Sequence, residues 1–393
     1  MRTLGLLTIL LIFNSDFASA QETFQEYRER IARERAELRE EYNRDSILAV
    51  REAEYESFRE DYLKEFQEFK DEMEQKWGDF KGRSNTNWIE YIDGGNTRLE
   101  VDFEEEEVIV EVLVEDPDDV EAAIKKLPEK VVETINNQGT EMGFESNEAG
   151  DEAVLENPVL EDQVDKDPGE SDEDFAERVV EENQVEVKQV VGEDGVERTL
   201  LSINFSLAPG SIQTRAEKVQ DYVSKFSEEY EIAPPLVFAI IHTESFFNPM
   251  AQSPANAYGL MQLVPTSGGA DAYRSVYNSD NGYPTPDFLF NPNNNVELGC
   301  AYIDILLNRY LRDVSNDLSK QYLAISAYNT GTGNVYKAYD SGGSKSRAMS
   351  KIESMTPQEN YEFLIQNLPY EETRDYLKKV VDRSKLYESW SDN

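Results

Sequence analysis

The chain has 393 residues, 39% of them hydrophobic and 11% aromatic, which is enough for two or three domains with a sizeable core. Its 80 Asp and Glu against 38 Lys and Arg give a net charge of −42, and so acidic a surface disfavours binding to nucleic-acid phosphates or anionic lipid. A single cysteine, Cys300, and a single histidine, His242, exclude a disulfide framework, a cysteine-based zinc site and a multi-histidine metal centre. We therefore expect neither a metal nor a cofactor.

The first twenty residues have the pattern of a secretory signal peptide. Arg2 supplies positive charge, Leu4 to Phe13 form an apolar stretch too short to span a bilayer, and Ala18-Ser19-Ala20 fits the small-x-small rule for cleavage. We expect an exported, periplasmic protein that begins at Gln21 and is soluble or peripherally associated with the outer membrane; a retained signal anchor is the alternative. A lipoprotein needs a cysteine just after the cleavage site, and Cys300 is the only cysteine, so no lipid anchor is expected.

Residues 21–82 are predicted to form a long, highly charged helical arm. Acidic and basic residues alternate in EYRERIARERAELREEYNR, and acid–base pairs four residues apart are frequent. Apolar residues recur only as a thin stripe that includes Phe24, Tyr27, Ile31 and Leu38. We expect the arm to dock on its own domain or on a cell-envelope protein partner; a solvated, partly frayed helix is the alternative.

Residues 83–207 are predicted to form a small, acidic α+β domain. Apolar and polar residues alternate as in strands, and one stretch keeps the three-to-four spacing of a helix despite Pro128. Residues 96–200 hold 35 acidic and 8 basic side chains, and we expect the acidic insertion 139–183 to be disordered or loosely held. The predicted strands are 97–103, 108–114, 184–191 and 199–206, and the predicted helix is 118–138.

From Ser211 to the end the pattern is helical, and the Ala208-Pro209-Gly210 stretch marks a boundary. Residues 211–393 carry 23 acidic and 16 basic side chains, so most of the charge lies upstream. We expect 211–393 to fold alone and to carry the chemistry of the chain, while residues 22–206 only position that part. The predicted helices are 211–230, 236–247, 296–312, 320–329, 357–367 and 371–389.

Glu244 is the first candidate for chemistry. It follows the apolar run Leu236 to Ile241 and precedes Phe246 and Phe247, a setting in which a carboxylate is poorly solvated. Burial disfavours the charged form and raises the pKa, and a carboxyl group that stays protonated near neutral pH can act as a general acid. The alternative is a capping or salt-bridged Glu near a helix end. His242 lies two residues away, on another helical face, and is interpreted as a packing or peripheral residue.

Four ordered sequence blocks surround this residue. They are Glu244-Ser245 followed by Asn248-Pro249, then Gly259-Leu260-Met261-Gln262, then Ala327-Tyr328-Asn329, and then Glu372-Thr373-Arg374-Asp375-Tyr376. In these blocks residues 211–390 resemble the lytic transglycosylases built on the goose-type-lysozyme-like fold. The resemblance implies a multidomain α+β protein whose C-terminal catalytic domain, 211–393, is all-α and lysozyme-like.

The upstream residues resemble, more loosely, the domain that precedes the catalytic module in one member of this family. The resemblance lies in Trp77, in Trp88-Ile89-Glu90-Tyr91, in Arg98 and in Asp102-Phe103-Glu104. That member is typically a lipoprotein, and the lipidation cysteine is absent here. The charged arm and the acidic insertion also depart from it.

The resemblance implies a reaction that needs only one carboxyl group, whereas ordinary glycosidases need two. Glu244 would protonate the glycosidic oxygen that leaves C1 of N-acetylmuramic acid. The resulting carboxylate would then take the proton of that sugar's own 6-hydroxyl, which closes a 1,6-anhydro ring. Because the nucleophile is tethered, no water needs activation. The substrate's 2-acetamido group would stabilise the cationic intermediate.

The resemblance also carries supporting roles for the peptidoglycan strand. Ser253 would orient the acetamido group or Glu244, Met261 and Gln262 would form the floor of the sugar site, Tyr328 and Asn329 would bond Glu244 or the sugar, and Tyr376 would face the cleft. The alternatives are a Ser-Pro turn for Ser253 and core packing for Met261 and Gln262. Two other functions stay open: a muramidase of the same fold that uses water, and a non-catalytic protein that binds or assembles the cell wall.

Overall fold

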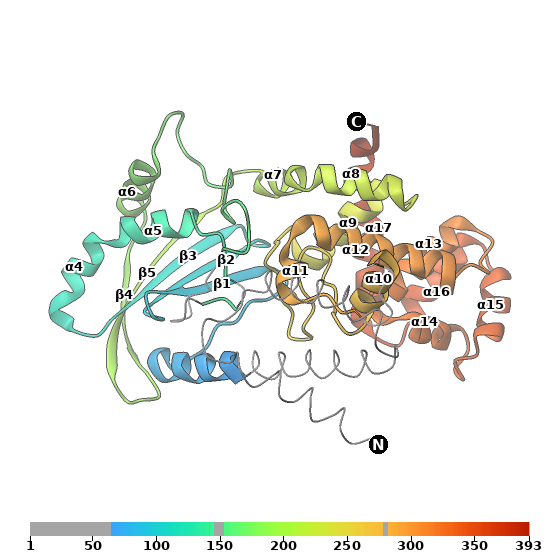
Figure 1. The fold of residues 1–393 in the computed structure, drawn as a ribbon, viewed down its shortest axis with the longest axis horizontal. Helices are drawn as coiled ribbons and strands as arrows, with labels where there is room; N and C mark the ends of the chain where they lie inside the picture. The colour runs from blue at the N-terminus through green and yellow to red at the C-terminus, as the bar shows by residue number, and fades with distance from the viewer. Residues whose placement is uncertain (1–63, 141, 145–152, 278–281, 393) are drawn as a thin grey trace, which may run out of the picture.

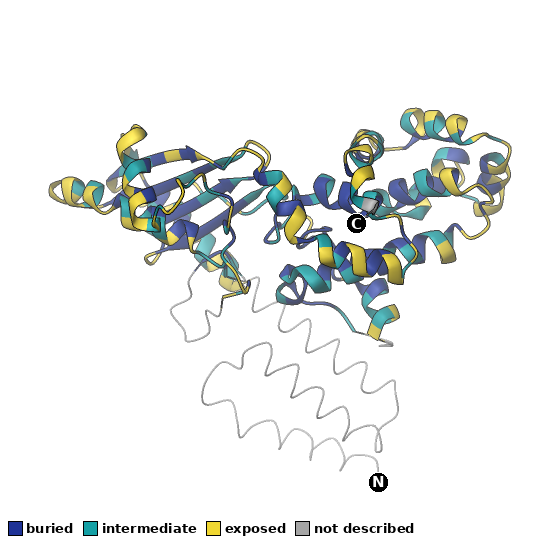
Figure 2. Ribbon diagram, turned by 90° about the horizontal axis from the view of Figure 1, so that it is seen from above, coloured by how far each residue is buried: buried dark blue, intermediate teal, exposed yellow. Residues whose placement is uncertain are grey.

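The computed structural model describes residues 64–140, 142–144, 153–277 and 282–392. Two parts follow each other along the chain and lie side by side in Figure 1: an antiparallel sheet with its covering helices, and an array of helices. Seen from above, buried residues dominate the sheet and the inner helices, and exposed residues gather on the outer helices (Figure 2). The expected α+β organisation is thus confirmed. The predicted signal peptide and the arm up to residue 63 lie outside the described residues.

The sheet has five antiparallel strands in the order β1-β2-β3-β5-β4. The alternating pattern predicts four of them, and β1 is the strand that it leaves out. Paired residues share a face of the sheet, so Tyr91, Arg98 and Glu111 point to the same side. The strands are β1 (Asn87–Ile92), β2 (Thr97–Asp102), β3 (Glu107–Val114), β4 (Glu186–Val191) and β5 (Glu197–Ser206).

One face of the sheet is covered by helices α5 (Leu127–Ile135) and α6 (Asp172–Glu182), as Figure 1 shows. Val131 of α5 and Phe175 of α6 join a buried apolar cluster with Leu99 of β2. The chain reaches α5 through the short helices η1 (Pro117–Asp119) and α4 (Val120–Lys125). The single helix predicted for 118–138 is divided there because proline has no N–H to donate, and Pro128 lies in the first turn of α5.

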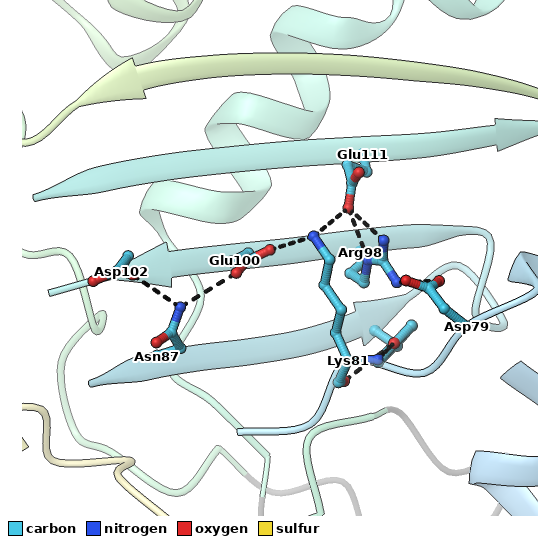
Figure 3. Close-up of polar contacts among 8 residues, drawn as sticks. Asp79, Lys81, Asn87, Arg98, Glu100, Asp102 and Glu111 are labelled. Carbon is cyan, nitrogen blue, oxygen red and sulfur yellow. Dashed lines mark hydrogen bonds and ion pairs between the residues drawn. The ribbon is translucent and has the colours of Figure 1, made fainter. Parts of the chain in front are cut away.

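The opposite face of the sheet carries the end of the arm, a helix over residues 64–77. Met73 and Trp77 are buried against the sheet. The Arg98 guanidinium lies 4.3 Å from the Trp77 ring centre and bonds Glu111 at 2.8 Å and Asp79 at 3.1 Å. Lys81 bonds Glu111 as well, at 3.2 Å (Figure 3). This part of the arm therefore docks on its own domain, and the ion pairs fix the segment that follows it.

The acidic insertion does not behave as expected. Its residues 153–183 pack on the domain, with Leu155, Val159 and Leu160 buried. Helix α6 lies in the same stretch, and the Ser171 side chain caps it by accepting a hydrogen bond from the backbone N–H at position 174. The expectation of a disordered or loosely held segment is wrong for these residues, because a few apolar side chains on one face suffice while the acidic ones face solvent.

The C-terminal part consists mainly of helices joined by loops. Helices α9 and α17 form its centre, and the six predicted helices are present within a few residues, the first of them divided into α7 and α8. The sequence did not predict α10, α11, α14 and α15. The bounds are α7 (Ser211–Lys218), α8 (Gln220–Glu229), α9 (Pro234–Ser245), α10 (Gly268–Tyr277), α11 (Pro286–Phe290), α12 (Pro292–Asp304), the π-helical turn η2 (Ile305–Tyr310), α13 (Asp317–Thr330), α14 (Thr332–Tyr339), α15 (Lys345–Glu353), α16 (Pro357–Asn367), α17 (Glu371–Ser384) and η3 (Lys385–Asp392).

The two parts share a core. The apolar cluster under the sheet continues into the helical part through side chains that include Met250, Tyr258, Leu263 and Phe290. This continuity does not agree with the expectation that residues 211–393 fold alone. Along the described chain, no helix is both long and apolar enough to cross a membrane.

Candidate active site

Helix α9 carries Glu244 in its last turn. Prolines open this helix, and the residues from Leu236 to His242 are all buried, so it runs through the middle of the helical part. The helix stops abruptly because Phe246 and Phe247 both have left-handed backbones, with φ of 51° and 62°. Each such residue without glycine's freedom costs about 1–2 kcal/mol. The surroundings must therefore hold this turn in place.

The Glu244 side chain is only partly accessible to solvent. Burial raises its pKa to about 8; the hydrogen bond from Tyr376 acts in the opposite direction, and the charge of Glu372 adds to the increase. The Tyr376 hydroxyl donates to Glu244 Oε1 at 2.6 Å. At neutral pH the carboxyl group is thus mostly protonated and still within reach of a ligand. This is the state that a general acid requires.

Two tyrosines lie around this carboxyl group. Burial raises the pKa of Tyr376 and of Tyr328 well above the ordinary value, and the charge of Glu244 adds to both increases. Both hydroxyls therefore stay protonated and can donate. The Tyr328 hydroxyl donates to the carbonyl oxygen of Met261 at 2.7 Å. Of the two tyrosines, Tyr376 has the hydrogen bond to Glu244, and Tyr328 supports the neighbouring loop.

That loop, residues 259–263, is held by internal hydrogen bonds. Gly259 has φ of 74°, and a Cβ there would lie 2.2 Å from the Leu289 carbonyl oxygen, so only glycine fits. Asn295, fully buried on α12, bonds the Leu289 and Tyr258 carbonyls and accepts from the Met261 N–H at 2.8 Å. Asn295 is not among the predicted site residues. The one feature of the sequence that could have indicated it is its place as the fourth asparagine of the Asn-Pro-Asn-Asn-Asn stretch that opens α12.

Two other predicted site residues, Met261 and Gln262, have contacts with other parts of the protein. The Met261 side chain is fully buried and packs against Gly299 of α12. Gln262 Nε2 bonds the Ala251 and Gly259 carbonyls, whereas its Oε1 is buried and has no partner within the described residues. These contacts agree with the packing alternative, and the sugar-site role of Met261 and Gln262 stays a prediction.

Ser253 and Asn329 do not bond Glu244. The Ser253 hydroxyl oxygen accepts from the Ala257 N–H at 3.1 Å, which is the turn considered as its alternative. Asn329 Oδ1 accepts from the Thr373 hydroxyl at 2.7 Å and so ties α13 to α17. The structure thus brings Tyr376 and Glu244 into direct contact, whereas the hydrogen bonds of Ser253, Gln262, Tyr328 and Asn329 are made to other groups.

Two further residues contact this site from outside the predicted set. Asn85, in the segment that leads into β1, donates to the backbone carbonyl of Glu244 at 3.1 Å. Arg215 of α7 donates to the carbonyl of Phe246 at 3.0 Å. The packing role predicted for His242 is confirmed: it is buried, it contacts the Tyr387 hydroxyl at 3.0 Å, and burial lowers its pKa to about 3. In the described ranges no group of three His, Cys, Asp or Glu could hold a metal ion.

Comparison with known proteins places both parts of the chain. The N-terminal domain of membrane-bound lytic murein transglycosylase C matches residues 55–218, and the transglycosylase SLT domain matches residues 221–350. A protein of Actinobacillus pleuropneumoniae serotype 5b (strain L20) with the name membrane-bound lytic murein transglycosylase C is 31% identical over 297 residues, 74% of this chain and 77% of its own length. The chain belongs to the lytic murein transglycosylase C family.

Two further proteins are similar over a smaller share of the chain. A lytic murein transglycosylase C of Klebsiella pneumoniae (strain 342) is 40% identical over 190 residues, 48% of this chain and 52% of that protein. The solved 70 kDa soluble lytic transglycosylase of Escherichia coli is 24% identical, covers 44% of this chain and 24% of its own, and has a TM-score of 0.34. The match to the transglycosylase SLT domain and the Actinobacillus relative confirm the family that the four sequence blocks predict.

Replacing Tyr376 with phenylalanine should shift the pH dependence of this lytic transglycosylase. The hydroxyl lowers the pKa of Glu244, so its loss should raise that pKa further and move the alkaline fall of kcat/KM to higher pH. A hydrogen bond to a charged group contributes about 1.5–3 kcal/mol, so kcat should drop by roughly tenfold or more where Glu244 must act as a carboxylate. Tyr361→Phe on α16 is the matched control. An unshifted pH profile in Tyr376→Phe would contradict the assignment.

The raised pKa also predicts a pH-dependent stability. Folded Glu244 has a pKa of about 8 against an ordinary 4.5, so the folded state binds the proton more tightly and loses stability as pH rises between these values. Glu244→Gln removes this penalty. The Tm of the variant should therefore exceed that of the parent at pH 8 and match it near pH 4. Each kcal/mol of difference in the free energy of unfolding corresponds to a change in Tm of about 2–4 °C. A Tm difference that is independent of pH would refute the raised pKa.

Proposed function

We propose that this chain cleaves the β-1,4 bond between N-acetylmuramic acid and N-acetylglucosamine in peptidoglycan, without water, and forms a 1,6-anhydro product. The observation that carries the proposal is Glu244: a partly accessible carboxyl group with a pKa of about 8, bonded by Tyr376. The names of the relatives, which describe murein transglycosylases, support the same substrate class.

In the first step, protonated Glu244 donates its proton to the glycosidic oxygen, and the bond to C1 of N-acetylmuramic acid breaks. The carboxylate that remains keeps the Tyr376 hydrogen bond, which favours the charged form. In the second step this carboxylate takes the proton of the 6-hydroxyl, whose oxygen attacks C1. Glu244 is thereby returned to its protonated state, so one residue completes the cycle.

One carboxyl group suffices in this scheme because the nucleophile belongs to the substrate. Glu372 affects the pKa of Glu244, but its side chain is exposed at the start of α17. A hydrolytic muramidase would need a group that holds and activates a water molecule. Glu244 itself is protonated and follows a buried apolar helix, which favours the intramolecular route. The substrate's own acetamido group would stabilise the cationic intermediate.

The substrate contacts that we propose are polar atoms around the same loop. We propose that Oε1 of Gln262, which has no partner within the described residues, accepts from a sugar hydroxyl or amide. A hydrogen bond there would remove the free-energy cost of an unsatisfied buried acceptor. Ser253 and Asn329 are proposed as further sugar contacts. Met261 and Tyr328 are proposed to act through the loop that they hold.

The products of digestion test the function. Purified protein acting on sacculi should release muropeptides that are lighter by one water than those from a hydrolase. Reducing ends would indicate the muramidase instead. A folded, glycan-binding protein that releases nothing would indicate the non-catalytic wall-binding or assembly protein.

We also propose that the chain is exported and loses residues 1–20. The relatives are named membrane-bound; the lone cysteine of this chain at position 300 does not fit a lipid anchor near Gln21. Mass spectrometry of the mature envelope protein should find Gln21 first and no acyl chain. A retained Met1 or an acylated terminus would overturn this proposal.

We propose that the part of the arm before residue 64 contacts a cell-envelope protein. Its apolar stripe is thin, and a helix with so thin a stripe needs a docking partner. A chain without residues 21–63 should act normally on soluble glycan and more weakly on sacculi in envelope extracts. Equal action on both would remove support for such a partner.

A further inference from the structure

The C-terminal end of α9, the helix that carries Glu244, is held by side chains from three separate segments. The last carbonyl groups of a helix lack partners inside it. Arg383 of α17 donates to the His242 carbonyl at 3.0 Å, Asn85 donates to the Glu244 carbonyl at 3.1 Å, and Arg215 donates to the Phe246 carbonyl at 3.0 Å. The turn from Glu244 to Phe247 is thus bonded from both domains.

Asn85 belongs to a segment that the sheet domain fixes firmly. Lys81 bonds Glu100 at 2.6 Å (Figure 3), and the buried pair of Arg83 and Glu90 has a contact of 2.6 Å. The Ser84 carbonyl accepts from the backbone N–H of Gln252, which belongs to the helical part. The position of the Asn85 amide is therefore set by the N-terminal domain, although the group that it bonds is the backbone of Glu244.

Arg215 connects the same turn to the sheet domain by another route. Its side chain is buried, with 3% exposure, and it donates to the Phe103 carbonyl at 3.2 Å and to Gln163 Oε1 at 3.2 Å, as well as to Phe246. Its guanidinium lies 4.9 Å from the Phe103 ring centre. Three uncharged acceptors, two backbone carbonyls and the Gln163 amide oxygen, hold the planar group in one orientation. A positive charge also suits the C-terminal end of a helix.

We propose that Asn85 and Arg215 are positioning residues, through which the N-terminal domain sets the place of Glu244 relative to Tyr376. The inference rests on the proposed role of Glu244. The left-handed turn after Glu244 needs support from outside the helix, and these two donors supply it. A catalytic group displaced by about 1 Å can lose roughly 10²-fold in rate, so support of this turn should appear in kcat.

The experiment uses the full mature chain, soluble glycan fragments, and separate measurement of kcat and KM. Asn85→Leu keeps the volume of the side chain and removes the donor, and Asn85→Ala removes both. Each variant should lower kcat by about tenfold or more and leave KM within about twofold. The matched control is Asn136→Ala, an exposed asparagine of the same domain that bonds Asp172. It should behave as the parent.

Arg215→Lys and Arg215→Met form the second pair. Lysine keeps the charge and one donor, so it should retain more kcat than methionine. Arg178→Met, which breaks a partly buried ion pair with Glu170 outside the site, controls for loss of an arginine. If Arg215→Met does not fold, the Asn85 pair decides, because Asn85 is only partly buried. If the parent is active and both Asn85 variants keep its kcat, this inference alone is overturned. If the parent leaves glycan intact, the proposed function is overturned, and this inference with it.

Discussion

Glu244→Gln should lower turnover on glycan strands by at least about 10²–10⁴, the usual contribution of a positioned acid–base group. The amide keeps the shape of the side chain and can still accept the Tyr376 hydrogen bond, but it can neither donate nor take up the required proton. Because one residue serves both steps, no second carboxyl group can replace it. Turnover is best measured by release of soluble muropeptides from purified sacculi.

Two measurements make this result specific. Binding of glycan fragments should persist in Glu244→Gln, since the volume of the site is unchanged. Glu362→Gln, on the exposed face of α16, should leave turnover as in the parent. Near-normal turnover in a clean preparation of Glu244→Gln would contradict the catalytic assignment.

Residues 211–393 expressed alone should fail to form a stable, active protein. The cut would expose apolar side chains that include Met250, Leu263 and Phe290, which share a core with the sheet domain. It would also remove two acceptors of Arg215, the Phe103 carbonyl and Gln163 Oε1, which hold this side chain beside the turn after Glu244. We expect aggregation or loss of cooperative unfolding by circular dichroism.

A longer fragment is the control for this truncation. Residues 64–393 keep the sheet, its covering helices and both contacts to the turn after Glu244, and should retain cooperative unfolding and cleavage. If 211–393 instead unfolded at the parent Tm with the parent kcat, the shared core would contribute nothing measurable. The division of labour predicted from the sequence would then be correct.

The sequence predicted what depends on local pattern. Alternation indicated β2 to β5, and the apolar run before Glu244 indicated both a buried helix and a raised pKa, which the structure bears out. The acidic composition of 139–183 concealed α6, because Phe175, Ala176 and Val179 are its buried residues and all are outnumbered by surface charges. Composition averages over the two faces of a helix, whereas folding depends on only one of them.

The sequence could not predict which atom each motif residue would bond. Met261 and Gln262 lie in a family block, yet Met261 packs against Gly299 and Gln262 bonds the Ala251 carbonyl, and a motif does not distinguish a ligand contact from a contact inside the protein. Asn85 and Arg215 carry no local signal either. Asn85 is 159 positions from Glu244 and Arg215 is 112 positions from Phe103, so only the folded chain brings them together.

Mass spectrometry of the muropeptides released by the purified mature chain tests the central claim most directly. If Glu244 alone serves as acid and then as base, the N-acetylmuramic acid ends should be 1,6-anhydro rings, lighter by one water than reducing ends. They should also gain no heavy oxygen when digestion takes place in ¹⁸O-labelled water. Reducing ends that carry the label would show that water is the nucleophile, and would contradict the single-carboxylate mechanism.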